Sequence, residues 1–241
     1  MFSRLSGLVV RFSEKFLTRA VYHQGEHIKL CDILAPMSRT RIGFFGGTFD
    51  PPHLVHLILA SEAAHQFSLS RLLWVLTPDP PHKQEQPITP LHHRLEMTQR
   101  VIENNAIFEL SRLEIDRPGP HYTLDTVKLL AGELPEADII LLIGSDSLRD
   151  MPNWRQSADL VTAVHKIGVM RRPGNTLDLA ELESHMPGLN EKVMFIDTLL
   201  QNLSSREIRR RVAEGEPYRY YVLPSVYDYI ESNHLYRNTA E

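Results

Sequence analysis

Short apolar segments alternate with amphipathic ones along most of the chain. Apolar or alternating runs, typical of strands, occur at residues 42–46, 71–76, 108–115, 138–144, 166–170 and 193–196. Between and after them, helical periodicity predicts helices at residues 57–67, 91–104, 123–134, 179–185, 204–215 and 224–232. This order predicts an α/β fold, a doubly wound Rossmann-like parallel sheet with helices on both faces. Such sheets bind ligands at the carboxyl ends of their strands.

The stretch from residue 77 to residue 90 interrupts this alternation. It holds five prolines and, among them, Lys83. Proline breaks helices and removes a donor from a central strand. We therefore expect a loop here that lies over or beside a ligand site.

Residues 1–39 do not follow the strand–helix pattern. Their apolar patch at residues 8–10 is interrupted by Arg11, which is unlike the long apolar core of a secretory signal. We expect a poorly ordered extension, with an amphipathic leader poor in acidic residues as the alternative. Because the first strand follows closely on Met37, we expect the functional N-terminus near that residue and a single domain over residues 40–238.

The composition of the 241 residues narrows the possible functions. The formal net charge is −4, whereas proteins that bind nucleic-acid phosphates are usually basic, so we expect no nucleic-acid partner. The single cysteine, Cys31, excludes an internal disulfide and fits a reducing, cytoplasmic location. No apolar run reaches the ~20 residues that span a bilayer, so we expect no membrane partner. The oligomeric state leaves no readable mark in the sequence.

The first predicted strand ends in a motif that favours anion binding, Gly46-Gly47-Thr48-Phe49-Asp50-Pro51-Pro52-His53-Leu54-Val55-His56. Its two glycines let backbone amides approach a phosphate, because no Cβ blocks them. The following helix, which we expect Asp50 to cap, directs its free N–H groups to the same place. His53 and His56 lie about one helical turn apart, so both can face one ligand.

A second candidate phosphate site lies near the end of the chain. Ser204 and Ser205 stand at the start of a predicted helix, and Arg209 follows about one turn later. Hydroxyl groups, a helix N-terminus and a guanidinium together suit a phosphate. Ser204 and Glu207 also have the spacing of a capping box, which supports a helix start here.

Other interpretations of these polar residues stay open. His53 and His56 could ligate a metal ion, but nothing nearby in the sequence completes a ligand set, so we predict no metal site. They could also be capping or core histidines. We interpret Arg210 and Arg211 as a solvated helix face rather than as ligand contacts.

Together the two motifs resemble those of the nucleotidylyltransferase superfamily, which is known for its paired histidines. More narrowly, the chain resembles the bacterial nicotinate-nucleotide adenylyltransferases. That resemblance rests on Pro80-Pro81-His82-Lys83, His121-Tyr122-Thr123-Leu124-Asp125-Thr126, Ile143-Gly144-Ser145-Asp146 followed by Trp154, Arg172-Pro173-Gly174, and Tyr227-x-x-Ile230 with Leu235-Tyr236. These blocks follow the family's order over about residues 40–236. Val55 and Arg206 stand where the family usually has glycine and threonine.

The resemblance implies transfer of AMP from ATP to nicotinate mononucleotide, giving nicotinate adenine dinucleotide and pyrophosphate in NAD biosynthesis. It implies catalytic roles for His56 at the α-phosphate, His53 at the triphosphate, and Lys83 and Arg209 at the leaving pyrophosphate. ATP-binding residues would be Gly46, Gly47, Thr48, Phe49, Gly144, Asp146, Ser204 and Ser205. The mononucleotide would contact Thr123 and Trp154, with core packing as the alternative for Trp154. Mg²⁺ would enter with ATP.

Two rival functions remain compatible with the sequence. One is adenylyl or cytidylyl transfer to another phosphate acceptor, such as phosphopantetheine. The other is a catalytically silent nucleotide sensor, which the departures at Val55 and Arg206 make conceivable. Pyrophosphate release with different acceptors separates these functions.

Overall fold

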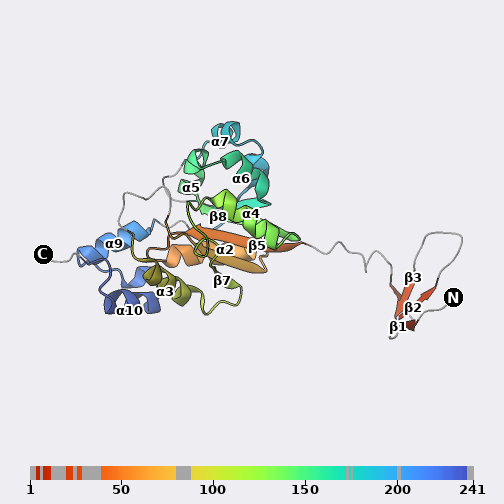
Figure 1. The fold of residues 1–241 in the computed structure, drawn as a ribbon, viewed down its shortest axis with the longest axis horizontal. Coiled ribbons are helices and arrows are strands. Elements are labelled where there is room, and N and C mark those ends of the chain that lie inside the picture. The colour runs from red at the N-terminus through yellow and green to blue at the C-terminus, as the bar shows by residue number, and fades with distance from the viewer. Residues whose placement is uncertain are drawn as a thin grey trace. The chain divides into compact units, whose positions relative to one another are not determined.

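The structure is a computed structural model that describes four short N-terminal strands and residues 39–79, 88–171, 174, 176–199 and 202–237. The chain divides into two compact units, Met1–Arg39 and Thr40–Glu241 (Figure 1). Among the described residues, no helix has both the length and the apolar character needed to cross a bilayer.

The N-terminal unit contains an antiparallel sheet with strand order β1-β2-β3-β4. Its strands are β1 (Arg4–Leu5), β2 (Leu8–Arg11), β3 (Ala20–His23) and β4 (Glu26–Ile28). None of them was among the elements that the hydrophobic pattern predicted. The expectation of a poorly ordered extension over residues 1–39 stays a prediction.

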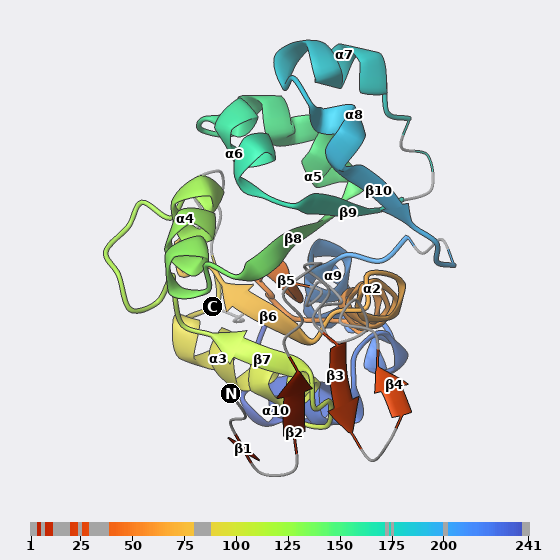
Figure 2. The same ribbon diagram turned by 90° about the vertical axis from the view of Figure 1, so that its right-hand side faces the viewer.

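The larger unit is built on a six-stranded, all-parallel sheet with the order β10-β9-β8-β5-β6-β7 (Figure 2). The strands are β5 (Thr40–Gly47), β6 (Arg71–Leu76), β7 (Phe108–Ser111), β8 (Ala137–Gly144), β9 (Lys166–Met170) and β10 (Val193–Ile196). The chain winds outward from β5 through β6 to β7, returns to β8 on the other side of β5, and continues to β10. This is the predicted doubly wound fold, and its switch point lies between β5 and β8.

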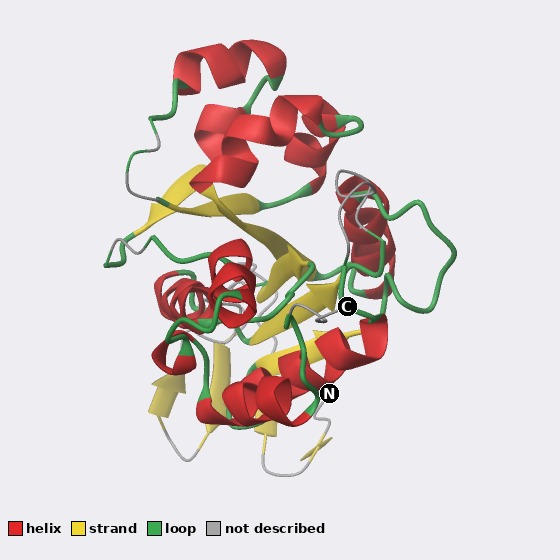
Figure 3. Ribbon diagram, turned by 90° about the vertical axis from the view of Figure 1, so that its left-hand side faces the viewer, coloured by secondary structure: helices red, strands yellow, loops and turns green. Residues whose placement is uncertain are grey.

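Helices cover both faces of this sheet (Figure 3). One face packs against α2 (Leu54–Gln66), α3 (Leu91–Ile102), α9 (Ser205–Ala213) and α10 (Pro224–Ser232). The other packs against α4 (Thr123–Glu133), α5 (Ser145–Asp150), α6 (Ser157–Ala163), α7 (Leu179–His185) and α8 (Leu189–Lys192). Two 3₁₀ turns, Met151–Asn153 and Arg219–Tyr221, complete the described helical segments.

Each strand contributes to both cores because side chains alternate along it. In β6, Leu72, Trp74 and Leu76 belong to the core under α2 and α3. Leu73 and Val75 belong to the core under α4 and α6. A strand that is buried on both faces reads as a continuous apolar run, which is why the sequence pattern located β6.

The structure shortens one predicted strand and adds three helices. The strand predicted at residues 108–115 ends at Ser111, because residues 112–116 form a turn in which the Asp116 amide donates to the Arg112 carbonyl oxygen at 2.9 Å. The pattern missed α5, α6 and α8; α5 and α8, with six and four residues, are too short to show a clear helical period. Of the predicted proline-rich loop, Thr77 and residues 88–90 are in neither helix nor strand, and residues 80–87 lie outside the described residues.

Candidate functional site

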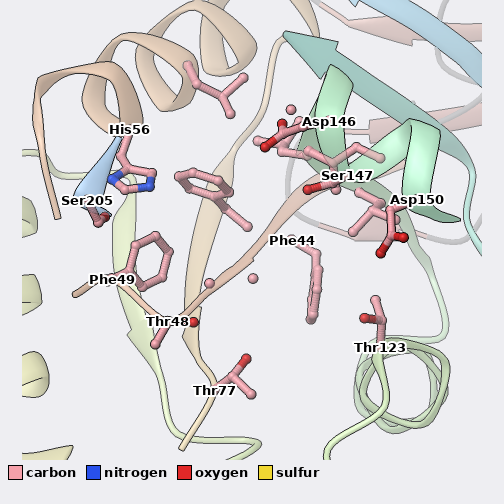
Figure 4. Close-up of a pocket in the computed structure, with 18 of the residues that line it drawn as sticks. Phe44, Thr48, Phe49, His56, Thr77, Thr123, Asp146, Ser147, Asp150 and Ser205 are labelled. Atoms are coloured by element: carbon pink, nitrogen blue, oxygen red, sulfur yellow. The ribbon is translucent and has the colours of Figure 1, made fainter. Parts of the chain in front are cut away.

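A cavity of about 810 Å³ lies at the carboxyl ends of β5 and β8, the switch point of the sheet (Figure 4). Its volume is in the range of small-molecule sites. Every candidate site residue in the described part of the chain lines it: Gly46, Gly47, Thr48, Phe49, His53, His56, Thr123, Gly144, Asp146, Trp154, Ser204, Ser205 and Arg209. Lys83 lies outside the described residues. Motifs separated by more than 150 residues therefore meet at one site.

The turn after β5 needs a residue without a side chain at position 47. A Cβ on Gly47 would lie 2.9 Å from the ring of Phe49. Phe49 has a φ of 48° and turns its ring into the core, with its centroid 5.3 Å from that of Phe45 and 5.0 Å from that of Trp74. The glycine thus lets an aromatic ring pack beneath the turn while the backbone borders the cavity.

His53 and His56 form a stacked pair at the start of α2. Their ring centroids are 3.7 Å apart with 24° between the planes. The backbone N–H of His53, the residue that precedes α2, donates to Nδ1 of His56 at 3.1 Å. Since Nδ1 accepts, the neutral His56 ring carries its proton on Nε2. The capping interpretation is therefore correct for His56, and it leaves Nε2 as the donor of this ring.

The structure also corrects the expected helix cap. His53, not Asp50, occupies the position before α2. Asp50 is only 4 % exposed, and its carboxylate instead accepts from the Tyr236 hydroxyl at 2.8 Å and from the Thr89 amide at 3.2 Å.

Val55, the departure from the family pattern, is the second residue of α2 and packs in the core.

The second phosphate motif is bonded directly to the first. Ser204 caps α9, as predicted, by accepting the Glu207 amide at 3.2 Å. The Ser205 hydroxyl donates to the Pro51 carbonyl oxygen at 2.8 Å. Nη1 of Arg209 donates to the Asp50 carbonyl oxygen at 2.6 Å and lies 3.9 Å from the Asp50 carboxylate. The start of α9 is thus held against the turn that leads into α2.

The neighbouring arginines have another role. Arg210 pairs with Glu207, Glu214 and Glu216, and Arg211 pairs with Glu207. Hydrogen bonds and charge from Arg210, followed by those from Arg211, lower the pKa of Glu207 to about 2. Neither arginine lines the cavity, in agreement with their interpretation as a solvated face.

A third group of residues borders the other side of the cavity. Gly144 ends β8, and Asp146 follows in the first turn of α5. Thr123 is the first residue of α4, on the opposite side of Phe44 from α2 in Figure 4. Trp154 both lines the cavity and packs, half-buried, against the core under α4, so the two interpretations of this residue are not exclusive.

Sequence reasoning missed two buried polar residues that line the cavity. Glu114 is 3 % exposed and accepts from the Thr126 hydroxyl at 2.7 Å, while Thr126 accepts from Nη2 of Arg117 at 2.9 Å. His121 is 6 % exposed, and burial lowers its pKa. His121 belongs to a block that carries the resemblance, whereas Glu114 lay inside the overlong predicted strand and gave no signal.

The cavity offers hydrogen-bond donors suited to anions. Hydroxyl groups, the starts of four helices (α2, α4, α5 and α9), three histidines and the guanidinium of Arg209 border it. Within the described ranges, no three His, Cys, Asp or Glu side chains are grouped as metal ligands. The arrangement can bind a polyphosphate between α2 and α9 and a second anionic molecule near α4.

Comparisons with known proteins agree with this geometry. A family model described as Cytidylyltransferase-like matches residues 44–211. The chain is 40 % identical over 198 residues to a probable nicotinate-nucleotide adenylyltransferase of Thermomicrobium roseum, a match that covers 82 % of this chain and 92 % of that protein. A similarly named protein of a Roseiflexus species is 40 % identical over 201 residues, covering 83 % of this chain and 100 % of its own.

A solved structure shares the fold at lower sequence identity. It is Plasmodium falciparum nicotinic acid mononucleotide adenylyltransferase complexed with NaAD, with a TM-score of 0.70 and 22 % identity. The match covers 82 % of this chain and 97 % of that one.

Proposed function

Because this chain belongs to the cytidylyltransferase-like family and, within it, to the nicotinate-nucleotide adenylyltransferases, we propose that it transfers AMP from ATP to nicotinate mononucleotide. The products are nicotinate adenine dinucleotide and pyrophosphate, in the biosynthesis of NAD. One observation carries the proposal: the histidine motif after β5 and the serine–arginine motif of α9 are hydrogen-bonded to each other at one cavity.

The reaction needs positioning and charge stabilisation more than acid–base chemistry. A phosphate oxygen of the mononucleotide attacks the α-phosphorus of ATP, a new P–O bond forms, and the bond to the β-phosphate breaks. The attacking oxygen is already ionised, so no protein base is required. Both reactants are anions, and aligned donors lower the barrier by offsetting their repulsion.

His56 is proposed to stabilise the charge that develops on the α-phosphate. Its Nδ1 is held by the His53 amide, so the ring presents Nε2–H as its donor. The stacked His53 ring supports this orientation and is proposed to contact the triphosphate. A fixed donor aimed at developing charge is the usual means of this kind of catalysis.

The remaining triphosphate contacts are assigned to the turn after β5 and to the start of α9. In this proposal Gly46, Gly47, Thr48 and Phe49 contribute from the turn, and Ser204, Ser205 and Arg209 from the helix. Lys83 joins Arg209 in neutralising the leaving pyrophosphate. Mg²⁺ enters as part of the ATP substrate, since it binds mainly through phosphate oxygens and water.

The mononucleotide is proposed to bind beside α4 and the segment after α5. The start of α4 at Thr123 supplies amides for the nicotinate carboxylate, and Trp154 supplies a face for the pyridine ring. A neutral carboxamide gains less from the helix dipole, so we expect the acid to be preferred over the amide. Gly144 and Asp146, which line the cavity, are proposed to contact the adenosine or a ribose.

The test is pyrophosphate release by the full chain with a panel of substrates. ATP or CTP is combined with nicotinate mononucleotide, its amide or phosphopantetheine, and the product is identified by mass. We expect the highest kcat/KM with ATP and nicotinate mononucleotide. A preference for phosphopantetheine or CTP would reassign the reaction, and no release with any pair would indicate a sensor.

We place the reaction in the cytoplasm, in keeping with the single cysteine.

A further inference from the structure

Arg94 is a buried cation that binds only backbone oxygens among its described hydrogen-bond partners. It lies on α3 and is 2 % exposed. Its guanidinium donates to four carbonyl groups: Nε to Thr89 at 2.8 Å, Nη1 to Thr77 at 2.8 Å and to Thr48 at 3.2 Å, and Nη2 to Pro78 at 2.7 Å. A single planar side chain thus holds three separate chain segments.

These three segments border the substrate cavity although Arg94 is not among the residues that line it. Thr48 belongs to the turn after β5, Thr77 follows β6, and Thr89 follows the cavity-lining residue Ile88. In the sequence, Thr77 and Thr89 lie on either side of residues 80–87, which include Lys83. Arg94 is therefore placed to fix their spacing without touching a substrate itself.

Asp50 contacts the same group of segments, which we call the Arg94 node: Thr48, Thr77, Pro78 and Thr89 with the Arg94 side chain. The Thr89 backbone is clamped twice, because its carbonyl accepts from Arg94 and its amide donates to the Asp50 carboxylate at 3.2 Å. The same carboxylate accepts from the Tyr236 hydroxyl at 2.8 Å, and the Asp50 carbonyl accepts from Arg209 at 2.6 Å. The node thus connects the C-terminal segment and α9 to the turn after β5.

The charge of Arg94 is retained despite its burial. Burial lowers the pKa of the guanidinium, while the charges of Asp50 and Asp79 oppose that change. An arginine remains protonated in proteins, so the side chain offers a fixed fork of donors. Lysine would keep the charge but has three donors on one nitrogen, which cannot match four carbonyls at these separate positions.

We propose that Arg94 is a positioning residue for adenylyl transfer, which sets the turn at Thr48 and the segments at Thr77 and Thr89 at the spacing that ATP requires. The inference rests on the proposed function, since it concerns the same cavity. A displacement of about 1 Å remote from the reacting atoms can cost ~100-fold in rate. We expect loss of the Arg94 contacts to weaken ATP binding before it affects the mononucleotide.

The test compares Arg94→Lys with Val101→Ala in the full chain. Val101 is a buried residue of the same helix that packs in the core, so its truncation destabilises the fold without touching the node. For Arg94→Lys we expect a rise of about tenfold in the KM and the calorimetric Kd for ATP, and kcat/KM for ATP lower by about 10- to 100-fold. The KM for the mononucleotide stays within about twofold.

A purely structural role gives a different result. Partial unfolding lowers the active fraction and hence kcat, but it leaves both KM values unchanged, as we expect for Val101→Ala. An Arg94→Lys protein that is folded and keeps the parent's KM and Kd for ATP would overturn the inference. Because ATP binding can be measured without turnover, this result can be told apart from a failure of the proposed function. If the parent chain binds ATP but releases no pyrophosphate, only the proposed function is overturned.

Tyr236→Phe provides the second variant if Arg94→Lys does not fold. It removes one hydroxyl from the Asp50 carboxylate and keeps the ring. We expect the Kd for ATP to rise by about threefold, with the folded fraction unchanged. A Kd equal to that of the parent would overturn the inference in that case.

Discussion

Arg209 donates from Nη1 to the carbonyl oxygen of Asp50 at 2.6 Å, although the two residues are 159 positions apart in the sequence. The bond joins the first turns of α9 to the turn that follows β5. It also orients the guanidinium at the edge of the cavity, where Arg209 is one of the lining residues. The two phosphate motifs are therefore held together at one edge of the cavity.

Replacing Arg209 should impair catalysis far more than replacing its neighbour. We expect Arg209→Ala to lower kcat/KM by about 100-fold, because a preorganised donor to the leaving pyrophosphate is lost. Arg210→Ala is the matched control, since it removes the same charge from the same helix but from a side chain that pairs with Glu207 and Glu216. Steady-state pyrophosphate release measures both. Equal losses in the two variants would show that general charge, not this contact, is responsible.

His56→Ala should lower kcat by about two to four orders of magnitude with little change in either KM. The reason is that a donor to the developing α-phosphate charge acts mainly in the transition state. His65→Ala is the control, since His65 lies in the last turn of the same helix and is exposed. A near-normal kcat for His56→Ala would remove His56 from the mechanism.

The sequence predicts an element well when its own residues show a clear apolar or polar pattern, and poorly when the element depends on contacts elsewhere. The bounds of β6, β9 and β10 agree with the prediction, because apolar positions dominate these strands. The end of β7 could not be predicted, since it depends on a turn closed by the pairing of Arg112 with Asp116 at 2.7 Å. Short helices such as α5 and α8 have too few turns to show a period.

The residues of the site likewise differ in what the local sequence shows of them. Gly47, His56 and Arg209 belong to motifs whose spacing points to phosphate binding, and the structure brings them to one cavity. Arg94 was not predicted, because a charged residue within an amphipathic helix is normally exposed. Its partners are backbone carbonyls of distant segments, which leave no trace in side-chain patterns. Glu114 was not predicted either, because it lies in the turn after β7, where a strand was expected, and is buried there.

Trp154→Ala should separate the two substrates. If the indole stacks on the nicotinate ring, we expect the KM for the mononucleotide to rise by about tenfold, which corresponds to the ~1.4 kcal/mol of an aromatic contact. The KM for ATP should change by less than about threefold. Trp154→Phe keeps an aromatic face and should recover most of the affinity. Initial-rate kinetics with each substrate varied in turn make the comparison, and parallel changes in both KM values would argue for a packing role alone.

The ion pairs of α9 should make stability depend on pH through Glu207. Hydrogen bonds and charge from Arg210, then Arg211, lower the pKa of this carboxyl from 4.5 to about 2 in the folded chain. A lowered pKa stabilises the fold above the unfolded value, and this contribution is lost as the pH falls from about 4.5 towards 2. We therefore expect Glu207→Gln to have a lower Tm than the parent at pH 6, and the difference to shrink steadily below about pH 4.5. Scanning calorimetry across this range gives the measurement, with Glu133→Gln at the exposed end of α4 as the control. A difference in Tm that is independent of pH would mean that the Glu207 side chain acts through packing instead.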